Sequence, residues 1–377
     1  MEVLYWSLGV LAFIVVLAVS IGLHEAGHMF VAKMFKLSVP RFFIGFGPTL
    51  FSKKKGVTEY GVKAIPLGGF VMIEDNTQPD DSPERAMLSH VSPWKRILVF
   101  FAGPAVNLVL GTVIIMAVLI LYPVSYVSNE VKSVQECFSS DSSVVCNARL
   151  GGMLPGDNVV AINGVDVSGS SEKISENLAG KDRVVLTVDR QGEKVNLDVS
   201  VTDNKIGILL HKKERHLGLS ESFDMLGTVV GKNVEVLAEI PSKVPALMET
   251  VVNKPTTEEI PSSVIVVGKT YGDVSASSSL AGSDKVQTIL LYSGLLNLGL
   301  GLINILPILP LDGGRIFIAI VDIFRMGFSR LTFRKWEYKP LSMKMINSMT
   351  AVAASFVFAF MGLVMLSDIM QIIRGQI

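Results

Sequence analysis

The segment His24-Glu25-Ala26-Gly27-His28 places two imidazoles and a carboxylate inside a long apolar stretch near the N-terminus. Helical positions four residues apart lie on one face, so His24 and His28 can bind one metal ion. Glu25 then lies beside that ion, where hydrolysis needs a general base for the attacking water. Ionisable side chains at membrane depth are costly and mark functional sites. We therefore predict a zinc-dependent hydrolytic site inside a membrane-spanning helix.

A third ligand is expected, because catalytic zinc commonly takes three protein ligands and keeps one position open. Asp312 is the candidate, since it follows another apolar segment on the same predicted side of the membrane. Read without the histidines, Asp312 is more simply interpreted as a helix stop before the glycines at 313 and 314. The histidine box favours the interpretation as a ligand.

The elements that must position these residues are membrane spans. Four segments are apolar over roughly the 20 residues needed to cross a hydrocarbon core: 6–28, 97–121, 287–308 and 347–371. Lysine and arginine are frequent between the first two and between the last two, so both loops are predicted to be cytoplasmic. Both termini and the long middle segment are then outside. The first and third spans run in the same direction, which brings the three candidate ligands to the cytoplasmic side.

The composition agrees with a multi-pass membrane protein. Of 377 residues, 49% are apolar and 18% are charged, and the mean hydropathy is +0.48. The formal net charge is zero, so nothing argues for a nucleic-acid partner, and the lipid bilayer is the expected surrounding. Glu2 precedes the first apolar segment without any cation. A signal peptide normally begins with cations, so the first span is expected to remain in the mature protein.

Two stretches outside the spans predict β structure. Residues 40–75 combine turn glycines with extended apolar runs, which predicts a membrane-associated hairpin or small sheet, with a solvated loop as the alternative. Alternating side chains around Gln191-Gly192-Glu193 predict a second hairpin, formed by 183–190 and 194–201. The pattern Leu-Pro-Gly-Asp-x-Val-x-x-Ile-Asn-Gly, which begins at Leu154, resembles a PDZ domain of the bacterial periplasmic type.

The predicted fold is a polytopic α-helical membrane protein with about four transmembrane helices, a membrane-associated β-hairpin or sheet, and one extracytoplasmic PDZ domain. Its predicted parts are a first transmembrane half with the zinc box, the PDZ domain, amphipathic linker helices and a second transmembrane half: 1–123, 124–212, 213–286 and 287–377. Cys137 and Cys146 lie close together in the predicted outer domain. A disulfide and two free thiols are both compatible with that spacing.

Several motifs together resemble the site-2 proteases, a family of intramembrane zinc metalloproteases, over the whole transmembrane frame. In chain order they are His24-Glu25-x-x-His28, Gly45-Phe46-Gly47-Pro48, Pro66-Leu67-Gly68-Gly69, Phe101-Ala102-Gly103-Pro104-x-x-Asn107, Asn304-x-x-Pro307 and Leu311-Asp312-Gly313. The chain looks most like the RseP-type group. The chain departs from the family in two ways: familiar enterobacterial members carry two PDZ domains, whereas this chain shows one, and Arg315 follows the glycine pair where histidine is frequent. The single PDZ domain looks more like actinobacterial members.

The resemblance implies that His24, His28 and Asp312 bind Zn²⁺ and that Glu25 is the general base. It implies location in a bacterial cell membrane. It also implies single-pass membrane substrates, such as anti-sigma factors or remnant signal peptides, cut after another protease has trimmed the ectodomain. The alternative is a catalytically inactive scaffold that holds a structural metal and acts through its PDZ domain. Structural zinc usually has four protein ligands, and this chain offers three.

Cleavage of a helical substrate requires unwinding, and an extended segment around residues 60–73 could pair with the unwound substrate as an added strand. Asn304 is a polar amide in an apolar span and is linked in the family to handling of the substrate backbone; helix packing is the alternative. The predicted substrate-binding residues are Asn304, Pro307, Asn297, Gly68 and Gly69.

Overall fold

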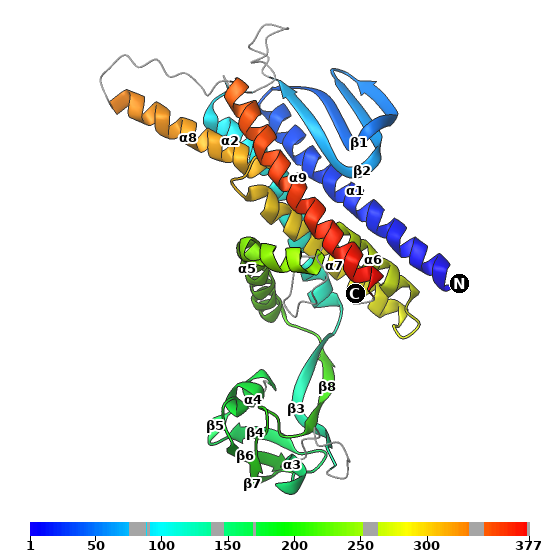
Figure 1. Cartoon of the computed structure of the whole chain (residues 1–377), viewed down its shortest axis with the longest axis vertical. Helices are drawn as coiled ribbons and strands as arrows, with labels where there is room; N and C mark the ends of the chain where they lie inside the picture. The colour runs from blue at the N-terminus through cyan, green and yellow to red at the C-terminus, as the bar shows by residue number, and fades with distance from the viewer. Residues whose placement is uncertain are drawn as a thin grey trace. The chain divides into compact units, whose positions relative to one another are not determined.

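The computed structural model describes residues 1–74, 88, 91–136, 147–168, 171–251, 263–331 and 343–374 (Figure 1). The chain forms two compact units, one of Met1–Val118 with Ser220–Ile377 and one of Leu119–Leu219. Cys137 and Cys146 lie outside the described residues, so their pairing stays a prediction.

The first unit is mainly helical. Its helices are α1 (Glu2–Met34), α2 (Pro93–Leu121), α5 (Leu219–Val251), α6 (Val264–Ala276), α7 (Gly282–Ile305), α8 (Asp312–Leu331) and α9 (Met343–Ile373). Among the described residues, four helical stretches are long and apolar enough to cross a membrane: Glu2–Met34, Pro93–Leu121, Gly282–Ile305 and Met345–Ile373. They overlap the four predicted spans, so the prediction of about four candidate transmembrane helices is confirmed.

Helix α6 packs along the first half of α1 and is more than a linker. Glycines permit this close approach, because a Cβ added at Gly9 would lie 2.3 Å from the Tyr271 carbonyl oxygen. Beside this contact, the rings of Phe13 and Tyr271 meet edge to face with centroids 5.3 Å apart, and Leu17 is buried with them. The first half of α1 is therefore held by protein contacts before the chain reaches the histidine box.

A long antiparallel hairpin follows α1 and lies beside it (Figure 1). It consists of β1 (Ser38–Lys55) and β2 (Thr58–Glu74). Phe42 of β1 faces both Val71 and Tyr60 of β2, so the first half of β1 lies between the two halves of β2. The second half of β2 is consequently at one edge of the sheet. The β region predicted for residues 40–75 is present.

The second unit is a sheet with strand order β7-β6-β4-β3-β8, and β5 pairs with β4. Its elements are β3 (Val124–Val134), α3 (Asn147–Leu150), β4 (Asn158–Ile162), β5 (Val165–Asp166), α4 (Ser171–Leu178), β6 (Arg183–Arg190), β7 (Glu193–Ser200) and β8 (Ile208–Arg215). The predicted hairpin is confirmed, with Arg190 paired to Glu193. Gln191 and Gly192 form the turn with φ of 56° and 91°, as a two-residue type I′ turn requires.

A buried carboxylate ties the turn before β4 to β6 in this sheet. The Asp157 side chain is 1% exposed and accepts hydrogen bonds from Arg190 Nε at 2.7 Å and Nη2 at 2.8 Å. It also accepts one from the Leu154 backbone N–H at 2.8 Å. Burial raises the pKa of the Asp157 carboxyl, but the hydrogen bonds from Arg190 and Leu154 outweigh burial and hold the pKa below its ordinary value.

Candidate metal centre

Helix α1 carries the two histidines one turn apart on one face. His24 and His28 are buried, at 7% and 6% exposed. Their rings meet edge to face with centroids 4.8 Å apart, and their Nε2 atoms are 3.2 Å apart. The helical repeat of the histidine box therefore aims both Nε2 atoms at one point, as expected for positions four apart.

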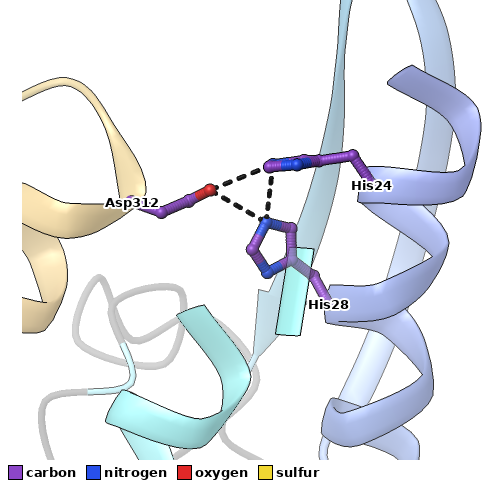
Figure 2. A group of neighbouring side chains, drawn as sticks. All are labelled: His24, His28 and Asp312. Carbon is purple, nitrogen blue, oxygen red and sulfur yellow. Dashed lines mark hydrogen bonds and ion pairs between the residues drawn. The ribbon is translucent and has the colours of Figure 1, made fainter. Parts of the chain in front are cut away.

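Asp312 reaches the same point from the start of α8. Its Oδ2 atom lies 3.0 Å from Nε2 of His24 and 3.2 Å from Nε2 of His28 (Figure 2). Helix α7 ends at Ile305, and the two prolines that follow cannot continue it. Asp312 is thus the first residue of a new helix and not the end of the previous span.

The glycines after Asp312 allow the connection between α7 and α8 to fold tightly. A Cβ at Gly313 would lie 2.2 Å from the carbonyl oxygens of Ile305 and Leu306, and one at Gly314 would lie 2.6 Å from the Leu309 backbone nitrogen. No side chain fits at either position without a backbone shift. The Gly-Gly pair is therefore needed to bring the start of α8, with its aspartate, back against the end of α7.

Helix α2 orients His28. Nδ1 of His28 lies 2.7 Å from the Val99 carbonyl oxygen, and a carbonyl oxygen only accepts, so Nδ1 carries the proton. The lone pair of Nε2 is then directed at the common point, which is how metal-binding histidines are usually held. His24 has a buried Nδ1 with no hydrogen-bond partner among the described residues.

The three donor atoms fit a zinc ion. Ligand atoms at 2.0–2.1 Å in a tetrahedron are about 3.3 Å apart, close to the 3.0 to 3.2 Å separations of the two Nε2 atoms and the carboxylate oxygen. Two neutral imidazoles and a carboxylate form a donor set typical of catalytic zinc. The group found among the described residues has these three members: His24, His28 and Asp312.

Gly103 of α2 closes one side of the centre. A Cβ at this position would lie 2.3 Å from Nε2 of His28 and 2.8 Å from Nε2 of His24. The glycine sits just before Pro104, which is inside the helix. The backbone of α2 therefore packs directly on the edges of both imidazoles that carry the donor atoms.

Glu25 lies between the two histidines in sequence and is half-buried. The second half of β2 passes close to it, because a Cβ at Gly69 would lie 3.0 Å from Cγ of Glu25. Arg315, in the first turn of α8, is near enough to interact electrostatically with this carboxylate, and its guanidinium lies 5.3 Å from the centroid of the Phe100 ring. A carboxylate thus borders the donor group and an edge strand.

The structure separates the predicted substrate-binding residues into two groups. Gly69 lies beside Glu25, and Gly68 precedes it with φ of 126°, a conformation that favours glycine. Asn304 is half-buried near the end of α7, and Pro307 is exposed in the connection to α8. Asn297 is 1% exposed and donates to the Ser293 carbonyl oxygen of its own helix at 2.9 Å, a position that favours helix packing over substrate contact.

The Val99 carbonyl and Gly103, both from α2, contact the donor residues and were not predicted to do so. In the sequence, the glycine-proline pair of α2 stands out only as part of a family motif. A buried ion pair between Arg96 of α2 and Asp322 of α8 was not predicted either. A proline inside an apolar span, together with charges flanking that span, was the available signal for a functional helix.

Comparison with known proteins agrees with the geometry. The sequence model of peptidase family M50 matches residues 12–349. The chain is 30% identical to zinc metalloprotease Rip1 of Mycobacterium tuberculosis, over 97% of this chain and 98% of that protein. It is 26% identical to putative zinc metalloprotease FN1322 of Fusobacterium nucleatum, over 86% and 91%. It is 28% identical to probable membrane metalloprotease ARASP2 of Arabidopsis thaliana, over 83% and 71%.

Proposed function

The chain belongs to peptidase family M50, the site-2 zinc metalloproteases, and on this premise we propose that it cuts peptide bonds within membrane-spanning segments of other proteins. The observation that carries the proposal is the convergence of two imidazole nitrogens from α1 and one carboxylate oxygen from α8. The same unit holds four candidate membrane helices among its described residues, and α1, which carries the histidines, is one of them. A hydrolytic centre in that setting suits substrates that are themselves embedded in the bilayer.

In this proposal His24, His28 and Asp312 hold the zinc, and Glu25 is the general base. A zinc ion held by these residues would supply a Lewis acid that lowers the pKa of a bound water to about 7. The Glu25 carboxylate accepts a proton from the attacking water and delivers it to the amide nitrogen of the leaving segment. The donor group has three members within the part of the chain that the structure describes, which argues against the inactive scaffold, because a structural zinc usually has four protein ligands.

The experiment that tests this function compares wild type with Glu25→Gln on a transmembrane peptide substrate, with the zinc content of both proteins measured. We expect Glu25→Gln to retain zinc and to cleave about 10²- to 10⁴-fold more slowly, because it cannot take up the proton. Glu176→Gln is the matched control, since Glu176 is exposed on α4 in the other unit. Unchanged cleavage by Glu25→Gln would refute the proposal.

The substrate backbone is proposed to pair with the second half of β2. This segment is at an edge of its sheet, and edge strands accept an extended peptide as an added strand. Gly69 brings the edge close to Glu25, so a paired substrate would present its peptide bonds near the base. Gly68, Asn304 and Pro307 are proposed to line the same path, with Asn297 a weaker candidate.

Kinetics of Gly69→Ala separate binding from catalysis. An added methyl would meet the Phe43 carbonyl oxygen at 2.9 Å and disturb the edge, so we expect KM to rise. Gly56→Asn is the control, because nothing lies within 4 Å of its Cβ position at φ of 64°, and asparagine tolerates that conformation. A change confined to kcat would argue for displacement of Glu25 and against strand pairing.

The Leu119–Leu219 unit is proposed to be a single PDZ domain outside the cytoplasm of a bacterial cell, with both termini on the same side and the metal centre near the cytoplasmic side. The support is the lysine and arginine content of the two shorter loops. A reporter enzyme that is active only outside the cytoplasm, inserted at the Gln191-Gly192 turn, should be active. Activity of a cytoplasmic reporter there would reverse the topology.

The substrates are proposed to be single-pass membrane proteins of the anti-sigma-factor type, or remnant signal peptides, after ectodomain trimming. The PDZ domain could act on them as a size filter or as a docking site. Deletion of residues 130–210 distinguishes the two roles and leaves paired stubs, since Val127 faces Lys212. A filter predicts that untrimmed substrates become cleavable, and a docking site predicts a general loss of cleavage.

A further inference from the structure

A buried ion pair joins α2 and α8, two helices that both contribute to the metal centre. Nη2 of Arg96, in the first turn of α2, donates to Oδ2 of Asp322 in α8 at 2.6 Å. The two side chains are 8% and 1% exposed. Burial of an ion pair carries a desolvation penalty that often cancels its attraction, so such a pair is weak support for stability by itself. Its geometry, in contrast, is constrained, because removal of either partner leaves the other charge buried. Oδ1 of Asp322 also lies 3.9 Å from Nη1 of Arg325, which is 40% exposed on the same helix.

Each of these helices supplies a part of the centre. Arg96 lies three residues before Val99, whose carbonyl accepts from His28, and seven before Gly103, which packs on both imidazoles. These three positions share one face of α2. Asp322 lies ten residues after Asp312, which is about 15 Å along the α8 axis. A small tilt of α8 at Asp322 therefore displaces the carboxylate at its start.

Most described side chains of α8 are not fully buried. Beyond its first turn, the described side chains that are fully buried are Ala319 and Asp322. Its large apolar side chains face outward, with Phe317, Phe324 and Phe328 between 52% and 73% exposed. Helix α8 is thus amphipathic, and beyond its first turn the ion pair with Arg96 joins it to α2.

We infer that Arg96 and Asp322 are positioning residues, which fix α8 against α2 and so hold the Asp312 carboxylate at the two histidine Nε2 atoms. The inference rests on the proposed function, in which Asp312 is a zinc ligand. Partners beyond the ligands tune metal affinity, and their loss typically lowers it by about 10- to 100-fold.

The test uses the full-length protein and compares Asp322→Asn with wild type. We expect the zinc affinity, measured by competition with a chelator, to fall about tenfold or more. The visible absorption of the Co²⁺-substituted protein should change, because that spectrum reports ligand geometry. Asp368→Asn is the matched control. Asp368 lies on α9, is also 1% exposed, and accepts a hydrogen bond at 2.5 Å from the backbone N–H of Ser263, which precedes α6. Its zinc affinity and cobalt spectrum should equal those of wild type.

A double variant, Arg96→Met with Asp322→Leu, removes the pair without leaving a buried charge, and apolar replacement of this kind usually preserves folding. It should melt like wild type and still bind zinc more weakly. Wild-type zinc affinity and cobalt spectrum in Asp322→Asn or in the folded double variant would overturn the positioning role. Absence of zinc from both wild type and Glu25→Gln would instead overturn the proposed function.

Discussion

Gly103→Ala should weaken zinc binding strongly, although it adds one methyl group to a residue that is not a metal ligand. The new Cβ would lie 2.3 Å from Nε2 of His28, and ordinary contact begins at 3.4 Å. The ring must therefore move by about 1.1 Å, while zinc–ligand distances tolerate about 0.2 Å. Helix α2 cannot move away from the histidines easily, because its backbone already packs closely on α7. A Cβ added at Gly111 of α2 would lie 2.8 Å from the Gly294 carbonyl oxygen of α7.

The expected loss is at least about 100-fold in zinc affinity, or about 2.8 kcal/mol. The assay is zinc content after dialysis against buffered zinc, with chelator competition for Kd and cleavage of a transmembrane peptide as a second readout. Gly299→Ala is the control for adding a methyl to a helix, since nothing lies within 4 Å of its Cβ position on α7. Gly111→Ala is the control for disturbed helix packing away from the donor atoms. A zinc Kd for Gly103→Ala within about threefold of wild type would refute the reasoning.

Three further predictions follow from the same structure. Gly313→Ala should weaken zinc binding about tenfold or more, measured by chelator competition, because its Cβ would lie 2.2 Å from the Ile305 carbonyl oxygen and displace Asp312; unchanged affinity would contradict this. Asp157→Asn should destabilise the sheet unit by roughly 2 kcal/mol at pH 7, measured by hydrogen exchange of sheet amides. The pKa of Asp157 is lowered in the folded protein, so its pairing with Arg190 is fully stabilising above the unfolded pKa of about 3.9. The difference in stability between wild type and Asp157→Asn should therefore disappear as the pH falls through the lower folded pKa. A stability difference that does not change with pH would contradict this prediction. Chelation of zinc should stop cleavage while the far-UV circular dichroism stays unchanged, because helix packing positions the ligands, and added zinc should restore activity; loss of helical signal would show that the metal holds the fold.

Local periodicity accounts for the parts of the molecule that could be predicted. The i, i+4 spacing of His24 and His28 places both on one helix face wherever that helix lies, and the four spans follow from their length and apolar composition. The β6–β7 hairpin follows from alternation around Gln191-Gly192. These features depend on neighbours in the chain, so they can be read without knowledge of the rest of the fold.

Only the tertiary structure decided which distant groups meet at the histidines. Charge asymmetry predicted Asp312 on the same side of the membrane as the histidines, but the 3.0 Å approach to His24 depends on the packing of Gly313 against the end of α7. The carbonyl of Val99 carries no side-chain signal at all. Arg96 and Asp322 are 226 residues apart, and each reads alone as a charge at a membrane surface. Long-range contacts of this kind leave no local periodicity, because the burial and partner of each residue are set by helices that the chain brings together only when it folds.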